Sequence, residues 1–225
     1  MNAAAGQPET SAVINAMTVD VEDYFQVSAF EPHLKRDNWD DHPCRVERNT
    51  RQILELFAAH DVTGTFFTLG WVAQRYPELI RDIVSGGHEL ASHGWEHVRV
   101  SSQTPAEFRA DATRTRKLLE DIGGVAVKGY RAASYSIGTA ETWAWDELAE
   151  AGYRYSSSIV PIHHDHYGMP GAPRYAFNAL DDRLLEIPIT TVAVAGRNLN
   201  CGGGGWFRLF PYEFSRWELN QVHTR

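Results

Sequence analysis

The 225-residue sequence predicts an α/β fold built on a mostly parallel β-sheet, either open or closed into a barrel. The alternation of strand-like and helix-like segments along the chain predicts this fold. Four polar clusters fall at the ends of strand-like segments, where such folds place their chemistry, and this indicates an enzyme. No break in composition divides the chain, and its 43% apolar residues suffice for a sizeable core. We therefore expect one domain over residues 12–225, preceded by a disordered lead-in at residues 1–11.

The N-terminal half supplies two strand-like and two helix-like segments. Residues 12–19 are mostly apolar and are followed by a cluster of acids, and residues 63–72 form a second β-rich run. Between them, side chains at positions 46, 50, 53, 54 and 57 fall at helical spacing. A second helix is predicted within residues 76–89, because Pro77 suits a first helical turn and Gly86 and Gly87 suit a helix end.

The clearest helical signal begins at Thr104. Thr104 and Glu107 form a capping box, with Pro105 at the first helical position. Core-facing positions then recur at intervals of four and three residues from Phe108 to Ile122. The remaining predicted elements are a strand and loop over 126–137, a helix from a Thr139 cap to about residue 151, and strands over 153–159 and 183–194.

Charge and cysteine content narrow the possible functions. Asp and Glu total 29 against 21 Lys and Arg, which disfavours binding to nucleic acid or to an anionic membrane but does not exclude a neutral substrate such as a sugar. No apolar run approaches the roughly 18–20 residues of a membrane span. Cys44 and Cys201 are expected to be free thiols in a reducing compartment. The first residues lack the pattern of a signal peptide, so a cytoplasmic location is predicted.

The stretch "ASHGWEHVRV" places His93 and His97 four residues apart. Two neutral imidazoles at this interval converge on one divalent cation, such as Zn²⁺, if the stretch is helical. The same spacing also suits ordinary surface histidines on a turn. A catalytic metal needs a third protein ligand, which the acids at 20–23 could supply from a different strand.

The alternation of side chains along a strand predicts the direction in which each of those acids points. Asp20 and Glu22 are expected on one side of the strand and Asp23 on the other, unless the strand has already ended. One carboxylate would bind the cation and another would take a proton from water; the alternative is a turn with solvated acids. Arg131 could pair with Asp20 and keep it ionised, or form a structural surface pair. The small residues at 132–134 would let backbone N–H groups approach a substrate oxyanion.

Four ordered segments resemble the polysaccharide deacetylases of the NodB-homology family. They are "TVDVEDYFQV", "GGHELASHGWEHV", "GYRAASYSI" and "YRYSSSIVPIHHDHYGMPGAPR", and the resemblance covers roughly residues 13–220. It is strongest to the branch found with exosortase-type exopolysaccharide gene clusters. The resemblance implies a distorted (β/α) barrel and a metal-dependent hydrolase that removes N-acetyl groups from amino sugars of a polysaccharide.

The resemblance also implies roles for individual residues. Asp20 matches the general base, Arg131 the residue that orients it, and His93 and His97 the metal ligands, with Zn²⁺ as the expected cation. Glu22 or Asp23 is the acidic ligand, and strand alternation favours Glu22. The remaining implied contacts are a backbone oxyanion donor near Ser134, a groove wall at Tyr135, and substrate contacts at Trp95, His163 and His164.

Several positions depart from the family pattern. Gly94, Ala133 and Ser156 stand where many members have a hydroxyl residue, proline and aspartate, respectively. The family's C-terminal histidine acid is expected beyond Arg225, so we expect a C-terminally incomplete barrel that lacks its last strand or strands. Two other functions remain open: a C–N hydrolase of the same fold that acts on a small cyclic amide or imide, and a non-catalytic carbohydrate-binding relative.

Overall fold

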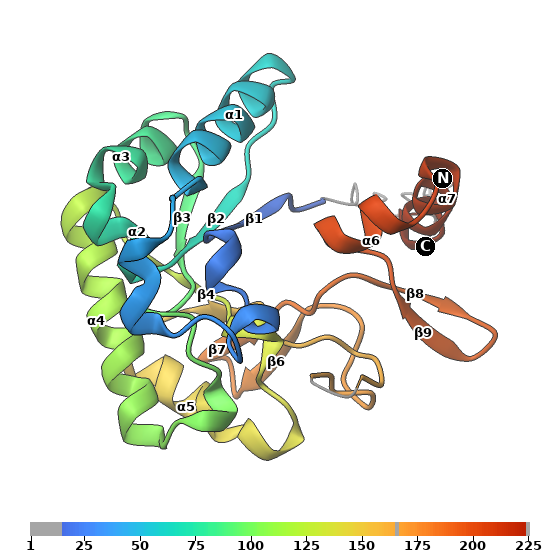
Figure 1. The fold of residues 1–225 in the computed structure, drawn as a ribbon. Coiled ribbons are helices and arrows are strands. Elements are labelled where there is room, and N and C mark those ends of the chain that lie inside the picture. The colour runs from blue at the N-terminus through green and yellow to red at the C-terminus, as the bar shows by residue number, and fades with distance from the viewer. Residues whose placement is uncertain (1–14, 165–166, 224–225) are drawn as a thin grey trace, which may run out of the picture.

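The computed structural model describes residues 15–164 and 167–223. Its centre is a seven-stranded sheet in the order β1-β2-β3-β4-β5-β7-β6 (Figure 1). The strands of this sheet are β1 (Thr18–Val21), β2 (Thr65–Thr68), β3 (Glu89–Ser92), β4 (Gly129–Tyr130), β5 (Tyr155–Ser156), β6 (Phe177–Leu180) and β7 (Leu184–Glu186). The predicted lead-in at residues 1–11 lies outside the described residues.

Strands β1 to β5 and β7 run parallel, and only β6 joins the sheet antiparallel, against β7. Consecutive strands therefore end at the same edge: Val21 is level with Thr68, Thr68 with Ser92, and Ser92 with Tyr130. Helices cover the outer side of the sheet, as in a distorted α/β barrel (Figure 1). The predicted fold class is confirmed, and so is the gathering of several strand ends at one edge.

The helices of this layer are α1 (Val46–Ala59), α2 (Gly70–Arg75), α3 (Pro77–Ser85), α4 (Pro105–Gly123) and α5 (Trp143–Glu150). Three of these five helices, α1, α3 and α4, lie where local sequence signals predict them. The capping box of Thr104 and Glu107 forms at the start of α4. The predicted apolar stripes face inward, since Leu79, Ile80 and Leu119 are fully buried. The helices over residues 46–57, 76–89 and 104–122 are therefore confirmed.

The strand predicted over residues 12–19 lies at Thr18–Val21, after exposed residues 15–17, and the strand predicted over 153–159 is limited to Tyr155–Ser156. Three further predicted boundaries are wrong. The strand at 63–72 stops at Thr68 and the chain turns into α2, because the amides of Gly70 and Trp71 donate to the carbonyls of Gly94 and Trp95. Glycine suits position 70, since a Cβ there would lie 2.5 Å from the Trp95 ring.

The other two errors concern the C-terminal half. Thr139 does not cap α5; it begins a separate 3₁₀ turn, Thr139–Glu141, whose Glu141 carboxylate accepts a hydrogen bond from the Gly138 amide. The strand predicted over 183–194 is two strands in two sheets, β7 and β8 (Thr191–Val194). Pro188 lies between them and has no N–H to donate to a strand ladder.

The last part of the chain lies apart from the helical layer. Strand β8 pairs with β9 (Arg197–Asn200) in an antiparallel hairpin, and α6 (Gly204–Leu209) and α7 (Tyr212–His223) follow (Figure 1). Short 3₁₀ helices complete the described elements: Tyr24–Gln26, Ser28–Phe30, Arg36–Asp41, Val100–Ser102 and Ala133–Tyr135. Within the described ranges, no helix combines the length and apolar character needed to cross a bilayer.

Candidate active site

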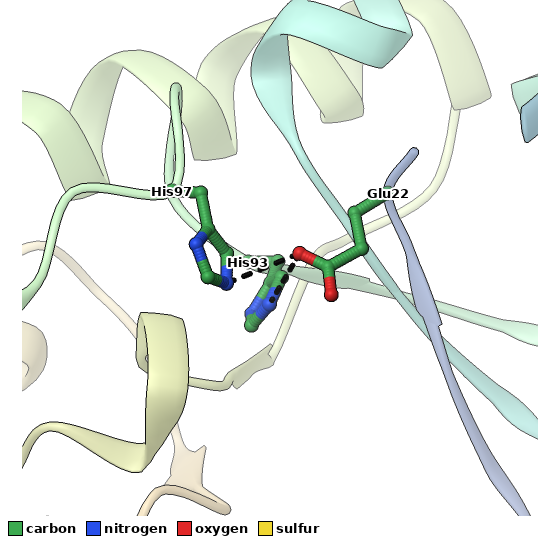
Figure 2. A group of neighbouring side chains, drawn as sticks. All are labelled: Glu22, His93 and His97. Carbon is green, nitrogen blue, oxygen red and sulfur yellow. Dashed lines mark ion pairs between the residues drawn. The ribbon is translucent and has the colours of Figure 1, made fainter. Parts of the chain in front are cut away.

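Glu22, His93 and His97 converge at the edge where β1 and β3 end (Figure 2). The Glu22 Oε2 atom lies 3.1 Å from His97 Nε2 and 3.7 Å from His93 Nε2. Donor atoms held by one tetrahedral cation at about 2.1 Å are roughly 3.4 Å apart, and the two distances lie on either side of that value. The geometry of the three side chains therefore fits a shared divalent cation.

The protonation states of the two histidines also fit a cation. Burial lowers the pKa of His93, and burial with the neighbouring His93 lowers the pKa of His97 to about 3, so both imidazoles are neutral at pH 7. The His93 Nδ1–H group donates to the Arg131 carbonyl oxygen at 2.8 Å, which leaves the Nε2 lone pair free to bind a metal.

The third donor is a buried oxygen that lacks a hydrogen-bond partner. Oε2 of Glu22 is shielded from solvent and accepts no hydrogen bond in the described structure. Burial and the nearby Asp20 carboxylate raise the pKa of Glu22 to about 8. A buried oxygen of this kind is costly unless a proton or cation satisfies it, so the donor set suits a divalent metal.

Asp23, the alternative acidic ligand, is not part of this cluster. Its carboxylate accepts hydrogen bonds from the amides of Tyr24, Arg45 and Val46 at 2.5–2.9 Å. It thereby caps the 3₁₀ turn at Tyr24 and the first turn of α1, where a negative charge is favourable. Strand alternation predicted the orientation of both acids correctly. The Glu22 side chain faces the histidines, and the Asp23 side chain points away from them and caps the helix.

The histidines converge through a loop, and the helical arrangement that the i, i+4 spacing suggested is wrong. Residues 93–99 are not helical, and Gly94 and His97 have positive φ angles of 78° and 53°. Arg36 fixes the loop from one side by donating to the carbonyls of Glu96 at 2.9 Å and His97 at 3.3 Å. From the other side, Asp111 accepts a hydrogen bond from the Trp95 amide at 3.1 Å.

Asp20 lies beside this cluster and pairs with Arg131. Arg131 Nη1 donates to Asp20 Oδ1 at 2.7 Å and to Thr18 Oγ1 at 3.0 Å. Its other nitrogens donate to the carbonyl and hydroxyl oxygens of Ser157, and the guanidinium lies 4.0 Å from the centre of the Phe67 ring. All three guanidinium nitrogens are thus engaged, and the pair expected from the sequence is present.

The ion pair controls the charge of Asp20. Burial alone would raise the pKa of its carboxyl group, but the Arg131 guanidinium, with smaller contributions from His93 and His97, holds that pKa below its ordinary value. The Asp20 side chain retains 25% exposure. Asp20 is therefore an ionised, accessible carboxylate next to a candidate metal site, as a base acting on water requires.

Ser134 and Tyr135 occupy a strained turn after β4. Both have positive φ angles, 52° and 51°, which are uncommon for residues other than glycine and are often found at functional sites. The Ser134 hydroxyl contacts the Ser28 hydroxyl, and the Tyr135 amide donates to the Ala132 carbonyl at 3.0 Å. The Tyr135 amide is therefore already used, and the oxyanion donor near Ser134 stays a prediction.

The residues predicted to contact substrate differ in their exposure to solvent. Trp95 is only 6% exposed, with the Arg114 guanidinium over its ring and Gly70 packed against it. This placement does not support the predicted substrate contact at Trp95, because its ring is buried against Arg114 and Gly70.

The two histidines predicted as substrate contacts are exposed. His164 stacks on the Tyr167 ring with centroids 4.0 Å apart, and the centroids of the Tyr167 and Tyr135 rings are 6.0 Å apart. A series of ring contacts thus connects Tyr135, in the turn after β4, to His164 through Tyr167. His163 is exposed next to His164.

Several residues that shape the site carried no recognisable sequence signal. Arg36, Asp111 and Ser157 act through contacts with residues 16 to 61 positions away in the chain. Asp111 looks like an ordinary surface charge on the predicted helix from Thr104, and Arg36 lies in a segment for which no element was predicted. Ser157 lies in the serine run "SSS" within the strand predicted over 153–159, which marks a polar strand end without specifying a partner.

The charge of Asp111 makes stability depend on pH. Burial raises the pKa of Asp111 to about 6, so the folded state favours the protonated carboxyl group. This contribution is complete below the ordinary value of 3.8 and is lost as pH rises through about 6. Asp111→Asn keeps an acceptor for the Trp95 amide, and its stability relative to wild type should rise between pH 4 and pH 8 by at most about 3 kcal/mol.

Urea unfolding of both proteins at several pH values measures this difference. Asp121→Asn, on an exposed position of the same helix, is the matched control and should give a constant offset. A constant offset for Asp111→Asn as well would contradict the prediction.

Two family models match the chain. The model described as "Polysaccharide deacetylase" matches residues 38–156, more than half of the chain, and includes His93, His97 and Arg131. A model described as a "Domain of unknown function (DUF3473)" matches residues 157–225. Asp20 and Glu22 lie before the first match, and the fold brings them to the matched histidines.

Individual relatives are similar to parts of the chain. A chitooligosaccharide deacetylase of Bradyrhizobium sp. (strain ANU 289) is 32% identical over 51% of this chain and 48% of its own length. A peptidoglycan-N-acetylglucosamine deacetylase of Bacillus cereus is 30% identical over 36% of this chain and 30% of its own length. The chain thus spans about half or less of these two relatives.

A solved structure is similar over a longer stretch. A Mycobacterium smegmatis protein assigned to the polysaccharide deacetylases is 27% identical, with a TM-score of 0.59 over 78% of this chain and 58% of its own. That likeness extends beyond the segment matched by the deacetylase model. With the match over residues 38–156, it identifies the chain as a member of the polysaccharide deacetylase family.

Proposed function

We propose that this protein hydrolyses N-acetyl groups on amino sugars of an extracellular or capsular polysaccharide and releases acetate. One observation carries the proposal: a glutamate and two neutral histidines share a focus beside an ionised Asp20 held by Arg131. Family membership supports N-deacetylation as the reaction class. The names of the two relatives, which act on chitooligosaccharide and peptidoglycan, support an amino-sugar polymer as the substrate class.

Glu22, His93 and His97 would hold the metal, and we propose Zn²⁺, since two imidazoles and a carboxylate suit it. When bound, such a cation supplies Lewis acidity that polarises the acetyl carbonyl and acidifies a water molecule. The His93–Arg131 carbonyl hydrogen bond keeps the His93 ring oriented towards the shared focus.

Asp20 is proposed to remove the proton from the attacking water. The low pKa that Arg131 imposes keeps Asp20 ionised at neutral pH, and hydrogen bonds from Arg131 hold it in one place. Arg131 cannot itself accept the proton, since its own pKa is raised above the ordinary value by the Asp20 charge despite burial. Asp20 would thus act as base and Arg131 as the group that orients it, and the proton taken up by Asp20 would be available for the amine released when the acetyl C–N bond breaks.

Ser134 and Tyr135 are proposed to contact the acetyl group and the sugar. The backbone N–H of Ser134, in the strained turn after β4, would stabilise the negative charge on the acetyl oxygen. The Tyr135 side chain would form a wall for the sugar, and the aromatic contacts through Tyr167 would continue that wall to His164.

Acetate release tests the proposal. The protein, loaded with Zn²⁺, is incubated with N-acetylated chitooligosaccharides and peptidoglycan fragments, and acetate is measured enzymatically. Release that stops with a chelator and returns with Zn²⁺ is expected. Hydrolysis of a small cyclic amide or imide without acetate release, or glycan binding with unchanged acetyl content, would contradict the proposal and favour the alternative hydrolase or the non-catalytic relative, respectively.

A further inference from the structure

Glu186 is a buried carboxylic acid with no role in the mechanism above. It is the last residue of β7, is level with Ser156 at the end of β5, and has 0% exposure. Its Oε1 atom accepts hydrogen bonds from the amides of Ser158 at 2.8 Å and Ile159 at 3.1 Å. Its Oε2 atom accepts one from Trp145 Nε1 at 3.2 Å. Burial raises the pKa of this carboxyl group.

The two amides belong to a turn that holds Arg131, the residue proposed to orient Asp20. In this turn the Ser157 carbonyl accepts a hydrogen bond from Arg131 Nε at 3.1 Å, and the Ser157 hydroxyl accepts one from Arg131 Nη2 at 3.0 Å. The Ser158 hydroxyl accepts one from the Ala132 amide at 2.9 Å. The turn thus fixes both the Arg131 side chain and the backbone that follows it.

These contacts form one chain from Glu186 to the proposed base. Glu186 fixes the turn, the turn fixes Arg131, and Arg131 Nη1 donates to Asp20 at 2.7 Å. Each contact involves a buried group for which a lost partner is costly. Displacement of the turn would therefore move the guanidinium and, through it, the carboxylate.

We propose that Glu186 is a positioning residue for the deacetylation reaction, acting through the Ser157–Ser158 turn on Arg131 and Asp20. The proposal rests on the proposed function. This role requires that the Glu186 Oε1 atom lie close enough to accept hydrogen bonds from the Ser158 and Ile159 amides. The Glu186 side chain contacts none of the three candidate metal ligands in the described structure, so metal binding should not depend on it.

Three variants distinguish the effect of the length of the Glu186 side chain from the effect of its charge. Glu186→Asp keeps the carboxyl group but withdraws it from the turn, and it should lower kcat by roughly 10- to 100-fold with KM unchanged. Glu186→Gln keeps an oxygen at the same reach and should stay within about 3-fold of wild type. Trp145→Phe removes only the donor to Oε2 and is the matched control, with unchanged kcat expected. Metal stoichiometry should be unchanged in all three.

A second measurement does not depend on activity. In the metal-free protein, hydrogen exchange of Arg131 Nε–H and of the Ser158 and Ile159 amides is followed by NMR. Exchange should be about 10-fold faster or more in Glu186→Asp than in wild type, and close to wild type in Glu186→Gln and Trp145→Phe. Circular dichroism verifies that each variant is folded.

The outcomes separate the two proposals. Equal exchange rates in Glu186→Asp and wild type, or a Glu186→Asp variant with higher KM and normal kcat, would overturn the positioning role. Absence of acetate release by the wild-type protein would overturn the proposed function instead, while the exchange rates would still show whether Glu186 holds the arginine in place.

Discussion

His97→Ala is expected to abolish tight metal binding. The substitution removes one of three converging donors and leaves Glu22 and His93, too few to hold a cation in a site of this kind. Elemental analysis after dialysis should show about one Zn²⁺ per wild-type chain and less than about 0.1 per variant chain. His93→Ala should give the same result, with the added loss of the hydrogen bond to the Arg131 carbonyl.

The control for this experiment is His60→Ala. His60 is exposed at the end of α1, so its loss should leave the metal content unchanged. Full metal stoichiometry in both His93→Ala and His97→Ala would place the binding site elsewhere. Thermal unfolding with and without Zn²⁺ gives a second reading, because a ligand that binds only the folded state raises its stability.

Asp20→Asn should retain the metal and lose turnover by about 10²- to 10⁴-fold. The amide keeps the size of the carboxylate and an oxygen that faces Arg131, but it cannot accept the proton from water. Asp20 does not belong to the Glu22, His93 and His97 cluster, so metal stoichiometry should stay near that of wild type. Acetate release and elemental analysis on the same preparation measure both quantities.

Asp23→Asn is the matched control for Asp20→Asn. Asparagine keeps one acceptor oxygen but turns an NH2 group towards a backbone amide that now donates to the second oxygen, so this variant should lose roughly 1–3 kcal/mol of stability and keep metal and turnover. Wild-type turnover in Asp20→Asn would remove Asp20 as the base. Loss of metal in Asp23→Asn with a normal fold would restore Asp23 as a ligand.

The charge state of Asp20 adds a pH dependence. Because the pKa of Asp20 is lowered in the folded protein, its ion pair with Arg131 contributes stability that is present above the ordinary value of 3.8 and is lost as pH falls through the folded value. The pair therefore remains formed over the neutral range in which hydrolysis would take place.

Much of the framework follows from the sequence alone, because its signals are local. The capping box at Thr104, the proline at position 77 and the periodic apolar positions are complete within one or two helical turns. Strand alternation likewise distinguishes Glu22 from Asp23 within three residues. Since parallel strands end at one edge of a sheet, the sequence also determined that acids and histidines far apart in the chain would approach one another.

The assembly of that edge depends on contacts between segments that are distant in the chain. The loop geometry of His97 depends on Arg36, the burial of Trp95 depends on Gly70 and Arg114, and the position of Arg131 depends on a turn held by Glu186. These contacts join residues up to 61 positions apart, and local periodicity does not specify such pairs. A buried polar group must find a partner, but which partner it finds is determined by the packing of the whole domain.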